Sequence, residues 1–213
     1  MKKSIIIGLT GQTGSGKSTV CSFALSKGAA VINADSVARE VVQKGSRCLA
    51  QLAEAFGGDI IKSSGELDRK LLAKRAFSDK EKTGLLNSIT HPFIIKSTAE
   101  KAEELRNQGY QIIVFDAPQL FESGADKICD VIVSVTAPEE IRLERIIRRD
   151  GLAPEEARLR MNAQLDEEYF RENSDYLIDG SKSIDEVKQE IGIVLEKIMS
   201  EKMRHNEKEA PDE

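Results

Sequence analysis

The stretch Gly8-Leu9-Thr10-Gly11-Gln12-Thr13-Gly14-Ser15-Gly16-Lys17-Ser18-Thr19 decides the fold. From Gly11 to Ser18 it matches the pattern G-x-x-x-x-G-K-S, which is typical of a loop that wraps the phosphates of a nucleotide. Glycines let the backbone turn tightly, so that successive N–H groups point inward at phosphate oxygens. The apolar residues 5–7 before the loop predict a strand, and the residues after it predict a helix. This is the context that a phosphate-binding loop requires.

The residues of this loop have expected roles in binding ATP and a metal ion. We expect contacts with ATP from Thr13, Gly14, Ser15, Gly16, Lys17, Ser18 and Thr19. Lys17 places a compact positive charge at the β- and γ-phosphates, and we also count it among the catalytic residues. The hydroxyl of Ser18 is placed to ligate Mg²⁺. The loop therefore predicts a phosphotransferase that uses ATP and Mg²⁺.

Composition and charge limit the class of protein. The chain has 213 residues, enough for one mid-sized domain with an added lobe or lid. The formal net charge of -5 argues against a protein that binds nucleic acid through general charge. No stretch approaches the roughly 20 apolar residues of a membrane span, and the first apolar run is too short for a signal peptide. We expect a cytoplasmic monomer or weak homo-oligomer, with reduced cysteines and no nucleic-acid or membrane partner.

Short apolar runs alternate with longer helical stretches along the chain, which indicates βαβ units. We predict an α/β fold like that of P-loop nucleoside-triphosphate hydrolases, with a five-stranded parallel sheet and helices on both faces. The expected strands are residues 4–9, 30–33, 111–115, 131–135 and 176–178. Ser183 and Glu186 form a capping box at the start of the last helix. Residues 1–200 form a single kinase domain in this interpretation, and the charged residues 201–213 form a disordered tail.

Two regions interrupt the alternation. Residues 36–110 are mostly helical and far longer than a simple crossover requires, so we expect an inserted helical lobe. Residues 145–172 are expected to form a lid. Six arginines occur between residues 142 and 160, where the acids are only four. Arginines that close from a lid can stabilise the charge of a phosphoryl group in transfer.

Two acids follow predicted strands, at the edge of the sheet where ligands bind in open α/β folds. Asp35 follows the second strand, and we expect it to be the general base that faces the acceptor hydroxyl. Asp116 follows the third strand after four apolar residues, a position that suits a ligand of Mg²⁺. The alternative for either acid is a helix cap or a turn former.

Single side chains outside the loop are weaker candidates. Arg145 and Arg149, four residues apart, would project from one helix face toward the site, where Arg145 stabilises transferred charge and Arg149 contacts ATP. A solvated helix face is the alternative for each arginine. His91 precedes Pro92 near the expected start of a long helix. It is either a cap or packing residue, or a contact of the acceptor.

Taken together, these motifs resemble the dephospho-coenzyme A kinase family over about residues 4–200. Beyond the loop, the resemblance includes Asp35 with Ala38-Arg39 and the run Gly65-Glu66-Leu67-Asp68-Arg69 followed by Leu72 and Phe77. It continues with His91-Pro92, the stretch 117–122, Arg145, Arg149-Asp150-Gly151, Arg158 and Gln164. One departure is Gln119, where the family usually has leucine, and it puts in doubt only the packing of that wall.

The resemblance implies an activity and further site residues. ATP-Mg²⁺ would phosphorylate the ribose 3′-hydroxyl of dephospho-coenzyme A, giving coenzyme A and ADP in the last step of coenzyme A biosynthesis. The lobe would hold the acceptor, and the lid would close over the nucleotide. The residues assigned to the acceptor are Thr10, Asp35, Arg39, Asp68, Arg69 and His91.

Two other functions are compatible with the loop alone. One is a kinase for another nucleoside or nucleotide acceptor, which the order of motifs after Asp35 disfavours. The other is a regulatory switch that hydrolyses GTP slowly. Such a switch normally carries an N-K-x-D motif for reading guanine, and we find none in the sequence.

Overall fold

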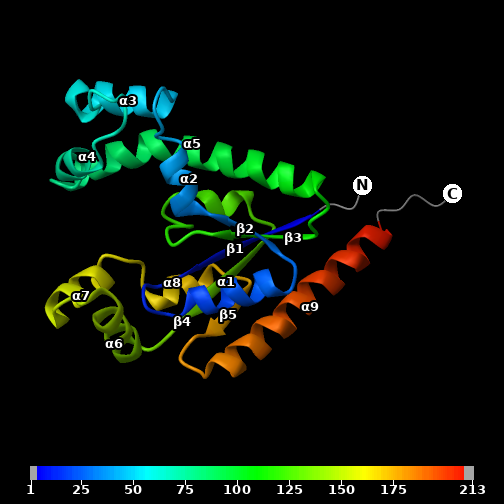
Figure 1. The fold of residues 1–213 in the computed structure, drawn as a ribbon. Helices are drawn as coiled ribbons and strands as arrows, with labels where there is room; N and C mark the ends of the chain where they lie inside the picture. Colours follow the sequence, from blue (N-terminus) through cyan, green and yellow to red (C-terminus); the bar gives the residue numbers. More distant parts are fainter. Residues whose placement is uncertain (1–3, 209–213) are drawn as a thin grey trace.

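The computed structural model describes residues 4–208. Its five strands form one parallel sheet in the order β2-β3-β1-β4-β5 (Figure 1). The strands are β1 (Ile5–Gly11), β2 (Ala30–Asn33), β3 (Ile112–Asp116), β4 (Val131–Thr136) and β5 (Tyr176–Asp179). The predicted α/β class and all five predicted strands are confirmed, with ends that differ by at most two residues.

Nine α-helices lie in the described part of the chain, with the short 3-10 helices η1 (Gly58–Ile60) and η2 (Ala125–Ile128). The first five are α1 (Lys17–Ser26), α2 (Ala34–Glu40), α3 (Arg47–Phe56), α4 (Arg69–Ala76) and α5 (Lys80–Asn107). The others are α6 (Glu139–Asp150), α7 (Pro154–Asn162), α8 (Glu167–Glu172) and α9 (Ile184–Lys208). None of the helices in residues 4–208 combines the length and the hydropathy that a membrane span requires.

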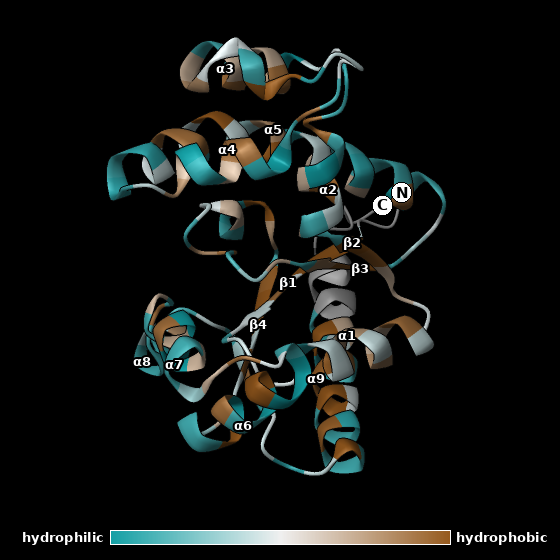
Figure 2. Ribbon diagram, turned by 60° about the vertical axis from the view of Figure 1, so that its left-hand side comes forward, coloured by the Kyte–Doolittle hydropathy of each residue, from teal (hydrophilic) through white to brown (hydrophobic). Residues whose placement is uncertain are grey.

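The strands are nearly continuous in apolar residues because both faces of the sheet are covered. Side chains alternate between the faces of a strand. In β1, Ile5, Ile7 and Leu9 pack with α1 and α9 on one face, and Ile6 packs with α2 and α5 on the other. Figure 2 shows β1 in brown, the colour of hydrophobic residues. Burial of such side chains contributes roughly 1.5–3 kcal/mol each, which fixes the central strand and the loop that follows it.

The inserted segment is helical, as predicted, and it forms a layer of its own. Helices α3, α4 and the first half of α5 lie beyond the sheet in Figures 1 and 2. Their apolar cluster is separate from the clusters on the two sheet faces, and its fully buried members include Leu52, Ile60 and Ala76. Helices α6 and α7 have another small cluster around Ile146, Ala157 and Met161. The lobe and the α6–α7 pair therefore each have a core.

Two predicted boundaries were wrong. Helix α5 begins at Lys80, so His91 lies in its middle and not near its start. Asp79 caps this helix by accepting a hydrogen bond from Lys82 N at 2.8 Å, and Pro92 is accommodated inside it. Helix α9 continues to Lys208, where the sequence analysis expected a tail from residue 201. The charged and Met residues of this stretch are good helix formers, which explains the extension. Residues 209–213 lie outside the described residues.

Candidate active site

The loop between β1 and α1 has the shape of a phosphate cradle. Gly14 (φ 80°) and Gly16 (φ 101°) adopt left-handed backbone conformations that favour glycine. A Cβ atom at Gly14 would lie 2.7 Å from the carbonyl oxygen of Arg142, so the close approach of α6 also requires glycine here. Ser15 N donates to Gln12 O at 3.1 Å and closes the turn. The predicted glycine pattern thus corresponds to a real constraint on the backbone.

The loop presents several backbone donors. The N–H groups of Gly14, Gly16, Lys17 and Ser18 have no acceptor within residues 4–208. Lys17 and Ser18 begin α1, where unpaired N–H groups and the helix dipole favour an anion. The Ser18 side chain is exposed at this helix start. An anion with several oxygens, such as the phosphates of a nucleotide, suits these donors.

Asp116 links the loop to the neighbouring strands. Its carboxylate forms an ion pair with Lys17 Nζ through Oδ1, and Oδ2 accepts a hydrogen bond from Asn33 Nδ2 at 3.1 Å. The strand register explains the meeting, because Asp116 in β3 pairs with Leu9 in β1 on one side and with Asn33 in β2 on the other. Asn33 was missed in the sequence analysis, although its place at a strand end next to Asp116 could have identified it.

Oxygen donors suited to Mg²⁺ are available here. Mg²⁺ is usually bound by one or two protein oxygens together with phosphates and waters. The Asp116 carboxylate and the Ser18 hydroxyl, at the carboxyl end of β3 and the start of α1, fit this donor set. No cluster of three or more His, Cys, Asp or Glu side chains that could hold a metal by itself occurs in the described part of the chain. A site shared with the nucleotide is the arrangement that these residues support.

Asp35 lies in the first turn of α2, two residues after the end of β2. Its side chain is exposed, and we find no hydrogen-bond partner for it among the described residues. Asn33, not Asp35, caps α2 by accepting from Ser36 N at 3.0 Å. The capping alternative for Asp35 is therefore wrong. Asp35 follows β2, the strand that pairs with β3 and so with the strand that ends in Asp116.

The two arginines of α6 that were assigned to the site, Arg145 and Arg149, have different surroundings. Arg145 donates from Nη1 to Gly14 O and Ser15 O at 3.2 Å, and from Nη2 to Gly180 O at 2.8 Å. Arg145 therefore binds two backbone carbonyl oxygens of the phosphate-binding loop. Arg149 is exposed and forms two hydrogen bonds with Asp150, which also binds Arg160. In this arrangement only Arg145 contacts the loop, and its role in charge stabilisation stays a prediction.

The residues assigned to the acceptor are spread over several elements. Asp68 caps α4 by accepting from Leu71 N at 3.0 Å, and Arg69 is exposed on the first turn of that helix. Arg39 is exposed on the last turn of α2. His91 is half-buried in α5, and this burial lowers the pKa of its imidazole. The structure leaves Arg39 on α2, Asp68 and Arg69 at the start of α4 in the lobe, and His91 in the middle of α5.

Thr10 and Gln119 have surroundings that bear on their predicted roles. Thr10 lies in β1 with a completely buried side chain, and its hydroxyl has no hydrogen-bond partner among the described residues. The structure therefore does not bring Thr10 to a surface where an acceptor could reach it. Gln119 is exposed, so the polar side chain that departs from the family pattern meets solvent at no packing cost.

Gly180 and Gln164 also contact the loop, and the sequence analysis gave neither a role. A Cβ atom at Gly180 would lie 1.8 Å from Ser15 O, so the turn after β5 packs directly on the loop. Gln164 Oε1 accepts a hydrogen bond from Thr13 N at 2.8 Å. Both contacts join residues far apart in the sequence, and only the tertiary structure reveals them.

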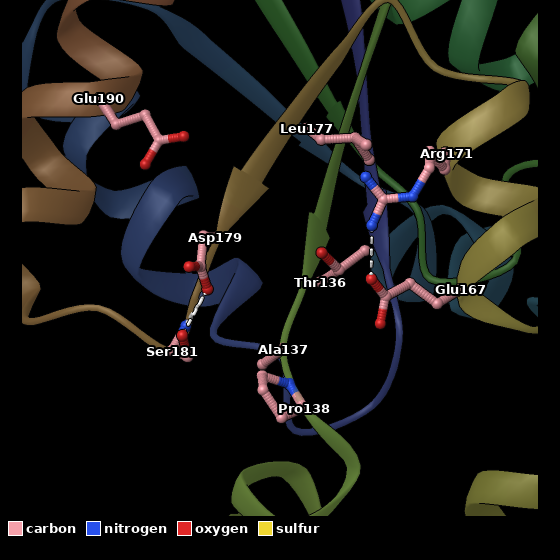
Figure 3. A pocket seen from close by; sticks show the side chains of 9 residues that line it. All are labelled: Thr136, Ala137, Pro138, Glu167, Arg171, Leu177, Asp179, Ser181 and Glu190. Carbon is pink, nitrogen blue, oxygen red and sulfur yellow. Dashed lines mark hydrogen bonds and ion pairs between the residues drawn. The ribbon is translucent and has the colours of Figure 1, made fainter.

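A cavity of about 340 Å³ lies beyond the carboxyl ends of β4 and β5 (Figure 3). Asp179 accepts hydrogen bonds from the backbone N–H and the hydroxyl of Ser181, and these bonds lower the pKa of its carboxyl group. Glu167 and Arg171 form an ion pair across another wall. The cavity lies at the carboxyl ends of the strands, as the phosphate-binding loop does, but no residue of the loop lines it.

The sheet order and the loop between β1 and α1 define the class of protein: a P-loop kinase. A family model described as dephospho-CoA kinase matches residues 5–186. The chain belongs to the dephospho-CoA kinase family.

Individual relatives agree with this assignment. A dephospho-CoA kinase of Corynebacterium glutamicum is 40% identical over 194 residues, covering 91% of this chain and 97% of its own length. A crystal structure of a Thermus thermophilus protein has a TM-score of 0.75 at 32% identity, covering 92% of this chain and 98% of the other. A dephospho-CoA kinase from Campylobacter jejuni has a TM-score of 0.60 at 26% identity, covering 92% and 97%. The predicted family is confirmed.

Proposed function

We propose that this chain transfers the γ-phosphoryl group of ATP to the ribose 3′-hydroxyl of dephospho-coenzyme A, giving coenzyme A and ADP. The observation that carries the proposal is the open donor array of Gly14, Gly16, Lys17 and Ser18, which lies beside the Asp116 carboxylate at the end of β3. Membership of the family over residues 5–186 supports the choice of acceptor. The enzyme would work in the cytoplasm as a monomer or weak homo-oligomer, on small molecules alone.

Nucleotide binding would rearrange one ion pair. Lys17 pairs with Asp116 in this structure, and a triphosphate in the loop offers Lys17 a stronger partner. An oxygen of Asp116, once released from Lys17, and the Ser18 hydroxyl would hold Mg²⁺. The metal, when bound, neutralises charge on the β- and γ-phosphates. Asn33 keeps the other oxygen of Asp116 in place during this exchange.

Asp35 would act as the general base. The hydroxyl oxygen of the acceptor attacks the γ-phosphorus, the bond to the bridging oxygen of ADP breaks, and the hydroxyl proton passes to the Asp35 carboxylate. Its exposure and lack of a protein partner leave it available for the acceptor. Its position at the start of α2 lies between the loop and the helical lobe, where an acceptor held by Asp68, Arg69, Arg39 and His91 would present its hydroxyl.

The arginines of α6 would act with the lid. Arg145 already touches the loop, and it would have to leave the carbonyl oxygens of Gly14 and Ser15 to direct its charge at the phosphates. Arg149 would first leave Asp150, an exposed partner that water and salt screen well. Phosphate oxygens are the stronger acceptors in a closed site, which favours this exchange when the nucleotide is bound.

A comparison of acceptors tests the proposed reaction. ADP release is measured with ATP-Mg²⁺ and either dephospho-coenzyme A, a nucleoside or a nucleoside monophosphate, and ³¹P NMR locates the new phosphate. We expect turnover with dephospho-coenzyme A and a phosphate on its 3′-oxygen. Turnover with a nucleoside monophosphate but not with dephospho-coenzyme A would overturn the choice of acceptor. A preference for GTP without any acceptor phosphorylation would instead support a regulatory switch.

The Asp35→Asn variant tests the mechanism. We expect kcat to fall by roughly 10²–10⁴-fold while ATP affinity changes little, because the amide cannot accept the proton. Glu100→Gln is the matched control, since it makes the same chemical change on the exposed face of α5. An unchanged kcat in Asp35→Asn would assign the base to another residue. Lys17→Ala should instead weaken both ATP binding and turnover.

A further inference from the structure

A pair of hydrogen bonds joins the phosphate-binding loop to the segment between α7 and α8. Thr13 N donates to Gln164 Oε1 at 2.8 Å, and Gln12 Nε2 donates to Leu165 O at 3.3 Å. We call these two bonds the clasp. The partners are about 150 residues apart in the sequence, and the segment that carries Gln164 lies between α7 and α8, within the expected lid of residues 145–172.

The loop side of the clasp is buried. Gln12 is 5% exposed, and its Oε1 has no hydrogen-bond partner among the described residues. A buried amide that already lacks one bond depends strongly on the bond that remains, because leaving both ends unpaired costs about 1–3 kcal/mol more. The contact between Gln12 and Leu165 therefore holds the two segments together.

The first residue of the expected lid, Arg145, also binds the loop. Arg145 of α6 binds the carbonyl oxygens of Gly14 and Ser15. Four consecutive loop residues, from Gln12 to Ser15, are thus bound by side chains or backbone of residues 145–165. The carbonyl oxygens of Gly14 and Ser15 accept from Arg145, and the Thr13 amide donates to Gln164. The loop and the lid region cannot shift independently while these bonds persist.

We propose that Gln164 is a positioning residue for phosphoryl transfer. It fixes the Thr13 peptide, which directly precedes the open N–H groups of the loop. Thr13 directly precedes Gly14, the first residue whose N–H group is open to a phosphate. Because the backbone N–H is a donor, the oxygen of the Gln164 amide must face it, and this fixes the orientation of the side chain. When the segment that carries Gln164 moves, the bond to Gln164 transmits the movement to the Thr13 peptide, next to the donors that would hold the terminal phosphate.

Loss of this bond would affect turnover more than binding. The open donors of Gly14, Gly16, Lys17 and Ser18 do not depend on Gln164, so they would still hold the nucleotide. The Thr13 peptide would become more mobile, and a small misplacement of the terminal phosphate is sufficient to slow transfer. This expectation rests on the proposed function, because it requires phosphoryl transfer at this loop.

Three variants separate positioning from a structural role. Gln164→Met has a similar length but no acceptor, and we expect kcat to fall about tenfold with KM for ATP changed less than about threefold. Gln164→Glu keeps an acceptor oxygen, so kcat should recover to within about threefold of the wild type, while its charge near the triphosphate raises KM for ATP. Asn162→Ala, at the exposed end of α7, is the control and should match the wild type.

Amide hydrogen exchange of the ligand-free protein tests the clasp without any assay of activity. The Thr13 amide should exchange slowly in the wild type and in Asn162→Ala, and faster in Gln164→Met. Equal exchange in all three, or equal loss of kcat in the Met and Glu variants, overturns the proposal. If exchange changes as expected but the wild type does not phosphorylate dephospho-coenzyme A, the clasp stands and the proposed acceptor fails.

Discussion

Gly180 lies against Ser15 so closely that a methyl group on its α-carbon would come within 1.8 Å of the Ser15 carbonyl oxygen. The contact joins the turn after β5 to the phosphate-binding loop after β1, two strands that do not pair directly. The same turn supplies the carbonyl oxygen that receives Arg145. The turn after β5 therefore forms one wall of the loop.

Gly180→Ala should displace that wall. The added methyl group meets backbone, which cannot rotate away, so we expect a loss of roughly 1–3 kcal/mol in the free energy of unfolding. ATP affinity should fall with it. Gly84→Ala is the matched control, because Gly84 lies in α5 with open space around it. This variant should raise the free energy of unfolding by roughly 0.5–1 kcal/mol. Urea unfolding and nucleotide titration measure both effects. Unchanged ATP affinity in Gly180→Ala would contradict the predicted role of this wall.

Asp116→Asn should separate metal dependence from folding. The amide keeps the shape of the side chain but loses the charge that attracts Mg²⁺, so the Mg²⁺ concentration for half-maximal rate should rise roughly 10–100-fold. Initial rates across a Mg²⁺ series at fixed ATP give this value. Asp130→Asn is the control, because Asp130 accepts from Ile6 N at the opposite end of the sheet. Identical Mg²⁺ curves for wild type and Asp116→Asn would remove Asp116 from the metal site.

His91 should make the protein less stable in mild acid. Burial lowers the pKa of this imidazole below its usual value, so the unfolded chain binds a proton more readily than the folded one. Stability from this group is therefore complete above the unfolded pKa of about 6.5 and declines as the pH falls below it. Urea unfolding at pH 8 and at pH 5.5 should show a smaller difference in His91→Gln than in the wild type.

NMR gives an independent check of His91. The chain has only two histidines, so the resonance that disappears in His91→Gln is assigned directly. Its titration midpoint in the wild type should lie below 6.5. A midpoint at or above that value would mean that the ring is solvated or paired with an acid, and the proposed source of the acid sensitivity would be wrong.

Local patterns in the sequence predicted the parts of the site that depend on local geometry. The glycines of the loop, Lys17 at the start of α1 and Asp116 at the end of β3 all follow from residue type and strand period. The partners of these residues depend on the tertiary structure. Arg145 was expected to face the phosphates, yet its guanidinium binds carbonyl oxygens of Gly14, Ser15 and Gly180, which no helical spacing reveals.

Helix ends were harder to predict for a different reason. Pro92 indicated a helix start near His91, but the Asp79 cap and the apolar packing of the lobe extend α5 to Lys80. The capping box of Ser183 and Glu186 was predicted and is confirmed by reciprocal hydrogen bonds. A capping signal made of two matching residues is therefore more reliable than one proline, which an established helix can absorb.

The separate apolar cluster of the lobe, built around Leu52 and Ile60, divides the chain into parts that can diverge at different rates. Substitutions among these residues change the end of the molecule that would recognise the acceptor, while the sheet and its loop keep their own packing. During evolution, substitutions in about three helices could thus change the alcohol substrate, while the residues that bind ATP stay the same.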